Sequence, residues 1–108
     1  MSSIISITRH NFEAEVLQAT KPLVIDVFAT WCGPCQHMEP YFSELSLELG
    51  DKYNFGKINI DEARDIAIDF GVMSVPTFLF LKQGDLIAQE VGYMSKEQLK
   101  ELIEKHLA

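Results

Sequence analysis

An apolar run at residues 23–29 gives the clearest structural signal in the chain. Only Asp26 interrupts it, and such a run is typical of a central strand that is covered on both faces of its sheet. Ahead of it, apolar residues alternate with polar ones over residues 5–7, which predicts a short strand. Apolar residues at helical spacing then predict a helix that runs from an N-cap at Thr8 to about Ala19.

A longer helix is predicted after the central strand. Apolar residues recur three and four positions apart over residues 38–49, and a glycine closes the segment. Pro40 lies inside it and has no N–H to donate, so we expect a kink there. Residues 53–60 have the pattern of the next strand, and a short helix should follow, capped by Asp61 and ended by Gly71. This alternation indicates βαβαβ units with parallel strands.

The pattern changes towards the C-terminus. Residues 77–81 and 86–91 are apolar runs joined by four residues, among which Gly84 can adopt the positive φ angle of a tight hairpin turn. Ser95 and Gln98 then match the spacing of a capping box and open a last helix with one apolar face. The chain is therefore of the α/β class, with a hairpin that follows the parallel strands.

Length, composition and charge limit the classes of function. A chain of 108 residues with 47% hydrophobic side chains has room for one domain, residues 1–108, whose core needs no metal or disulfide. Sixteen acidic against nine basic residues give a net charge of -7, and no two basic residues are adjacent, which disfavours nucleic acid as a partner. The chain has no apolar run long enough to span a membrane and no signal-peptide pattern at its start, so we expect a cytoplasmic protein. We also expect a monomer.

Two cysteines lie where the buried strand ends and the long helix begins. A sulfur in the first turn of a helix faces unpaired N–H groups and the positive end of the helix dipole, which stabilise a thiolate. Cys32 is therefore the expected nucleophile, and Cys35, one turn further in and better shielded, is the expected resolving thiol. Pro34 fixes the turn at a position where the helix needs no N–H, and Gly33 keeps side-chain bulk away from the sulfur.

The residues of this segment alone also allow other interpretations. A Cys-x-x-Cys pair is half of a zinc site, but the chain has no further cysteine, and its three histidines lack the spacing of zinc ligands. Two inert core thiols are disfavoured by the intervening Gly33-Pro34, which favours an exposed turn. Trp31 is either an ordinary surface aromatic or an apolar contact for a substrate that approaches Cys32.

Asp26 is the second candidate for chemistry. It shares a strand face with Val24 and Phe28, so its carboxyl group should point into apolar surroundings. A buried acid has a raised pKa and can accept a proton near neutral pH. The alternative is an acid exposed at the edge of the sheet.

The chain resembles the thioredoxin family along nearly its whole length. The resemblance rests on Asp26, the segment Trp31-Cys32-Gly33-Pro34-Cys35, Pro40, Lys57, Val75-Pro76-Thr77, Gly84 and Gly92. It implies a thioredoxin fold with a central five-stranded mixed sheet flanked by four helices, and an activity that reduces protein disulfides. It also implies no bound cofactor, because electrons would come from NADPH through a flavin-containing thioredoxin reductase.

The resemblance also assigns roles to residues outside the dithiol. Lys57 matches the lysine that neighbours the buried acid, although by itself it would be a solvated charge. The proline that matches Pro76 is cis in this family, whereas sequence alone favours a trans bond. The backbone of Val75 would then pair with an extended substrate. Gly92 would leave room in the same groove, or it forms an ordinary turn.

Four residues depart from the common pattern of the family. Gln36 replaces a frequent lysine, His37 a frequent apolar residue, Phe28 a frequent tryptophan and Ser74 a frequent glycine. None of these changes removes a catalytic group, but they leave the redox potential and the choice of partner open. His37 is a solvated side chain, a titrating modulator or a metal ligand.

These observations predict a thiol-disulfide oxidoreductase. The Cys32 thiolate would attack a substrate disulfide, Asp26 would take the proton from Cys35 directly or through water, and Cys35 would then release the reduced substrate. An oxidase or isomerase of the same fold is disfavoured by Gly33-Pro34, because related oxidants usually carry a histidine there. The alternative from another class is a redox-independent binding module that uses the apolar residues around Trp31.

Overall fold

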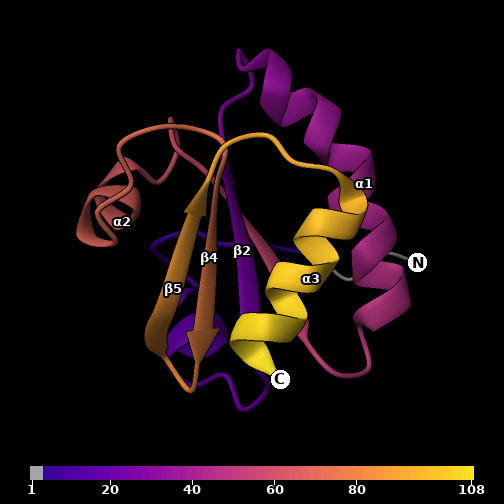
Figure 1. Ribbon diagram of the computed structural model, residues 1–108. Coiled ribbons are helices and arrows are strands. Elements are labelled where there is room, and N and C mark those ends of the chain that lie inside the picture. The colour runs from indigo at the N-terminus through magenta and orange to yellow at the C-terminus, as the bar shows by residue number, and fades with distance from the viewer. Residues whose placement is uncertain (1–3) are drawn as a thin grey trace.

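A five-stranded sheet runs through the middle of the molecule (Figure 1). The computed structural model describes residues 4–108; residues 1–3, part of the N-terminal segment compared above with a signal peptide, lie outside the described residues. The strands are β1 (Ile5–Ser6), β2 (Leu23–Phe28), β3 (Asn54–Asn59), β4 (Thr77–Lys82) and β5 (Asp85–Val91), in the spatial order β1-β3-β2-β4-β5.

The sheet is mixed, as the family resemblance predicted. Strands β1, β3 and β2 are parallel, whereas β4 is antiparallel to β2 and β5 is antiparallel to β4. The central strand β2 is buried over Leu23–Val27, which confirms that both of its faces are covered. Its register places Asp26 beside Lys57 on β3 and beside Phe78 on β4.

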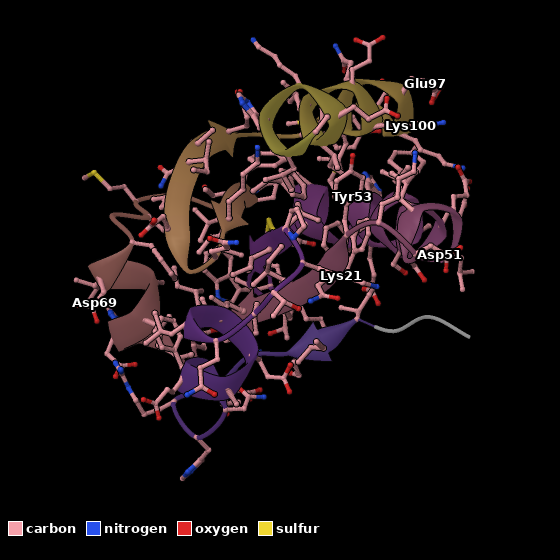
Figure 2. The ribbon with its side chains drawn as sticks, turned by 90° about the horizontal axis from the view of Figure 1, so that it is seen from below. Lys21, Asp51, Tyr53, Asp69, Glu97 and Lys100 are labelled. Atoms are coloured by element: carbon pink, nitrogen blue, oxygen red, sulfur yellow. A yellow bond between two sulfur atoms is a disulfide. The ribbon has the colours of Figure 1, made fainter. Side chains whose placement is uncertain are left out.

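Helices cover both faces of the sheet, which creates two apolar layers. Helices α1 (Gly33–Leu49) and α3 (Lys96–Leu107) pack on one face, and the π-helix η1 (Glu13–Leu17) and α2 (Arg64–Asp69) pack on the other. Figure 2 shows Glu97 and Lys100 on α3 and Asp69 on α2 at opposite sides of the molecule. The α1/α3 layer contains Val24, Met38, Phe42, Phe78, Leu99 and Ile103, and the opposite layer contains Val16, Ile25, Ile66, Ala67 and Leu79.

The prediction for the first helix is wrong in its start and its type. The helix begins at Glu13, and the backbone N–H of Gln18 donates to Glu13 O at 2.9 Å, five residues back. The N-cap of this helix is Phe12 and not Thr8, whose own N–H donates to the side-chain oxygen of Asn11 at 2.8 Å. A local side chain to backbone hydrogen bond of this kind competes with helix formation.

The prediction that Asp61 caps the second helix is also wrong. Helix α2 begins at Arg64, and its N-cap position, Ala63, has no capping side chain. The backbone N–H of Asp61 donates to the side-chain oxygen of Asn59 at 2.9 Å, and its carboxylate is used elsewhere. Gly71 ends α2 with a φ of 75°, as predicted.

The predictions for the hairpin turn and for the start of the last helix are confirmed. The β4–β5 hairpin turns on Gln83 and Gly84, whose φ angles of 50° and 85° are those of a two-residue turn with both central residues left-handed. The capping box of Ser95 and Gln98 opens α3. Helix α1 continues through Pro40 to Leu49.

Candidate functional site

The two cysteines form a disulfide at the N-terminus of α1, directly after β2. Their Cα atoms are 5.2 Å apart. Cys32 is the N-cap of α1, and its Sγ accepts a hydrogen bond from the backbone N–H of Cys35 at 3.2 Å. A sulfur that takes the place of a capping oxygen is stabilised as an anion by this N–H and by the helix dipole. Cys32 therefore lies at the start of the helix, where the sequence placed it, and its role as the nucleophile stays a prediction.

The predicted difference in exposure between the two sulfurs is not observed in the disulfide. Cys32 is 6% exposed and Cys35 is 4% exposed; with Ala29 they form a small buried cluster against which Phe28, Ile60 and Val75 pack. The two differ instead in what they face. Cys32 Sγ lies 3.9 Å from the carbonyl oxygen of Val75, whereas Cys35 lines a cavity, partly open to solvent, together with Asp26.

Asp26 is buried, as the apolar run predicted. The residue is 5% exposed, and its Oδ1 has no hydrogen-bond partner among the described residues. The pKa of Asp26 is raised from 3.8 to about 7, chiefly by burial and also by the charge of Glu39, while the charge of Lys57 acts in the opposite direction. A carboxyl group with this pKa exchanges a proton readily near neutral pH.

A cavity of about 580 Å³ connects this acid to the dithiol. The residues of the lining that bear on the chemistry are Asp26, Phe28, Cys35, Gln36, Glu39 and Lys57. A water occupies roughly 30 Å³ in the liquid, so the cavity has room for water between the groups. Lys57 reaches it from β3, with its Nζ 5.9 Å from the centroid of the Phe28 ring. Asp26 and Cys35 thus line one cavity that has room for water between them.

The segment on the other side of the dithiol comes from the turn before β4. The Val75-Pro76 peptide bond is cis, as the family resemblance predicted. Pro76 is buried and its carbonyl accepts a hydrogen bond from the backbone N–H of Gly92 at 2.9 Å. A Cβ added at Gly92 would meet nothing within 4 Å, but its φ of 106° is one that side-chain-bearing residues rarely adopt. Glycine is therefore required here by the backbone angle, and it also leaves the surface open.

Trp31 is exposed but not free. The residue is 70% exposed, and its indole Nε1 donates a hydrogen bond to Asp61 Oδ2 at 3.1 Å. Sequence reasoning missed Asp61 as a site residue because it was assigned to a helix cap. A signal was present, since Trp31 and Asp61 follow two adjacent parallel strands, whose carboxyl ends meet at one edge of the sheet.

The four residues that depart from the family pattern lie around the site. Phe28 lies beneath Lys57, and the side chain of Gln36 donates to the carbonyl of Thr30 at 2.7 Å. Exposed His37 packs edge-on against the ring of Tyr93, with centroids 6.5 Å apart. The carbonyl of Ser74 accepts the hydroxyl hydrogen bond of Thr77 at 2.6 Å. Tyr93 and Glu39 were not singled out from the sequence, because an exposed aromatic or acid has no distinctive pattern.

Residues 4–108 include no helix that is both long and apolar enough to cross a membrane. Over the same range, no three His, Cys, Asp or Glu side chains are arranged to hold a metal ion.

Comparisons with known proteins agree with this geometry. A family model described as Thioredoxin matches residues 3–105. The chain is 42% identical over 105 residues to a thioredoxin of Bacillus subtilis, which covers 97% of this chain and 99% of that protein. It is 36% identical over 107 residues to a thioredoxin of Haemophilus influenzae, which covers 99% and 100% of the two chains. A thioredoxin of Staphylococcus saprophyticus is 38% identical over 105 residues, 97% of this chain and 99% of that one.

Proposed function

The chain belongs to the thioredoxin family and is a thiol-disulfide oxidoreductase, and we propose that Cys32 attacks the substrate disulfide and Cys35 resolves the intermediate. The observation that carries this division of roles is the placement of the two sulfurs. Cys32 caps α1 beside Val75, on the side where a substrate would approach, whereas Cys35 lines the cavity that contains Asp26.

The proposed reaction has two exchange steps. The Cys32 thiolate attacks one sulfur of the substrate disulfide; a mixed disulfide forms, and the other substrate sulfur leaves as a thiolate. Asp26 then takes the proton from Cys35, directly or through water in the cavity. The Cys35 thiolate attacks Cys32 Sγ, which forms the internal disulfide and releases the second substrate sulfur. The substrate gains two electrons, and the dithiol loses two.

We assign substrate binding to the residues that surround Cys32. They are Trp31, Gly33, Pro34, Val75, Pro76 and Gly92. A Cβ added at Gly33 or Gly92 would meet nothing within 4 Å, so a substrate chain can approach the backbone closely at both positions. Val75 is partly exposed at the turn before β4, where an extended peptide could pair with its backbone. Asp61 would hold the Trp31 indole in place during this contact.

The oxidised protein needs a reductant to complete the cycle. We propose that a flavin-containing thioredoxin reductase supplies electrons from NADPH, and that the chain itself binds no cofactor. A dithiol that reduces other proteins works in a compartment kept reducing, such as the cytoplasm. We further propose that residues 1–108 act as one domain and as a monomer.

Reduction of insulin by dithiothreitol tests the proposal. The wild type should accelerate the reaction, Cys32→Ser should abolish the acceleration, and Cys35→Ser should accumulate mixed disulfides. Retained acceleration in Cys32→Ser would overturn the assignment of the nucleophile. A wild type that binds partner proteins but does not accelerate the reaction would instead indicate a redox-independent binding module.

A further inference from the structure

Glu39 lines the same cavity as Cys35 of the dithiol. It lies on α1 four residues after Cys35, a spacing that places two side chains on the same face of a helix. Both residues line the cavity, and Asp26 and Lys57 line it as well. Glu39 is exposed, whereas Asp26 is buried, so the cavity runs from a buried carboxyl group to a carboxylate at its solvent side.

The charges that face Asp26 come from two elements. On β3, Lys57 is its neighbour in the sheet register, and on β4 its neighbour is Phe78, which carries no charge. From α1, Glu39 and Cys35 line the same cavity, and Cys35 does not titrate while it is held in the disulfide. Among the described residues, Lys57 and Glu39 are therefore the charged side chains that act on Asp26.

These two charges act in opposite directions. The ammonium group of Lys57 stabilises the Asp26 anion and lowers the pKa of Asp26, whereas the Glu39 carboxylate destabilises the anion and raises that pKa. The effect of Glu39 is the larger of the two, although burial contributes more than either charge. Without Glu39, Lys57 would act unopposed and make Asp26 a weaker base.

We propose that Glu39 is a positioning residue for the resolution step: it lines the same cavity as Lys57, Asp26 and Cys35, and its negative charge offsets the positive charge of Lys57 at Asp26, the base that deprotonates Cys35. This inference rests on the proposed role of Asp26 as the base. The proton moves from Cys35 Sγ to the Asp26 carboxylate and leaves later to water. The electron pair freed on Cys35 forms the bond to Cys32 Sγ, and the substrate sulfur departs with the pair of the broken bond. Glu39 itself takes no proton.

The test compares Glu39→Gln, Lys57→Gln and the double variant with wild type. Glu101→Gln is the matched control, because it removes the same charge from an exposed position on α3 that does not line the cavity. The first measurement is an NMR titration of the Asp26 carboxyl group in the oxidised protein, where the cysteines do not titrate. The second is the pH profile of mixed-disulfide resolution in a single turnover.

The expected results have opposite signs. Glu39→Gln should move the Asp26 midpoint to lower pH by roughly 0.3 to 1 pH unit, and Lys57→Gln should move it to higher pH. The double variant should return towards wild type, and Glu101→Gln should leave the midpoint unchanged. The pH profile of resolution should move with the titration. The effect of Glu39→Gln should shrink in 1 M salt, since an exposed charge is screened.

Two failures are distinguishable. If Asp26→Asn slows resolution but Glu39→Gln matches Glu101→Gln in both the titration and the pH profile, the role of Glu39 is overturned and that of Asp26 stands. If the resolution rate does not depend on Asp26 at all, the proposed base is wrong, and the inference about Glu39 falls with it.

Discussion

Replacement of Asp26 by asparagine should make the oxidised protein more stable above pH 7 but should not stabilise it near pH 4. The side chain is 5% exposed and has an oxygen without a hydrogen-bond partner in the described part of the chain. Its anion is therefore poorly solvated. Asparagine has a similar shape and carries no charge at any pH.

The sign and size follow from the two pKa values of this carboxyl group. Burial raises the pKa from 3.8 to about 7 in the folded protein. Between these values the unfolded chain has released a proton that the folded chain keeps, so the free energy of unfolding falls as the pH rises from about 4 to about 7, and then levels off. Each pH unit is worth about 1.4 kcal/mol, so the ionised side chain costs the fold up to about 4 kcal/mol.

The amide of asparagine offsets part of this gain. Burial of an imperfectly paired amide costs roughly 1 to 2 kcal/mol. We therefore expect Asp26→Asn to raise the free energy of unfolding by roughly 2 to 3 kcal/mol at pH 8. At pH 4 the free energy of unfolding should stay the same or fall. Lys57 reduces this gain in stability because it stabilises the Asp26 anion of the wild type, whereas Glu39 increases the gain because it destabilises that anion.

Urea unfolding of the oxidised proteins at pH 4 and pH 8 measures the effect, provided that the denaturant dependence is the same in both. Asp51→Asn is the matched control, because Asp51 lies exposed in the turn after α1 (Figure 2). Its stability change should be small at both pH values. If Asp26→Asn is no more stable than wild type at pH 8, or gains equally at both pH values, the pKa of Asp26 is not raised by burial.

Three further predictions concern the sulfurs and the indole. In the reduced protein near neutral pH, iodoacetamide should alkylate Cys32 before Cys35, because Cys32 caps α1 and Cys35 faces the cavity; equal labelling in a peptide map would contradict this. Cys35→Ser should trap mixed disulfides with cellular proteins on a non-reducing gel, whereas a variant without either cysteine should trap none. Asp61→Ala should free the indole of Trp31, the one tryptophan of the chain, and lower its fluorescence anisotropy, with a stability change below about 1 kcal/mol. Unchanged anisotropy would show that this hydrogen bond does not hold the ring.

The features that the sequence predicted well depend on neighbours along the chain. The hairpin at Gly84 and the capping box of Ser95 need particular residues at short spacings, and both are present in the structure. The Cys32 position at a strand–helix junction and the burial of Asp26 follow in the same way from one apolar run and the helix behind it. Local backbone preferences and periodicity suffice for such features.

The sequence was less informative where side chains had a choice of partners. Asp61 has a side chain that often caps helices and lies shortly before α2, but it accepts the indole N–H of Trp31, thirty positions away. Thr8 is also a residue type that often caps helices, but its backbone N–H donates to the side chain of Asn11 instead. A polar side chain near a helix start can cap it or bond elsewhere, and the choice depends on which groups the fold brings within reach.

The environment of the dithiol was decided by the tertiary structure. Periodicity shows that Asp26 faces inward, but it does not show that β3 places Lys57 beside it or that α1 brings Glu39 to the same cavity. The covering of Cys32 by Val75, forty-three positions along the chain, depends in the same way on the turn before β4. The sequence thus identifies the residues expected to carry the chemistry. The charges and contacts that surround these residues come from segments that are distant in the sequence and that meet only when the sheet packs against its helices.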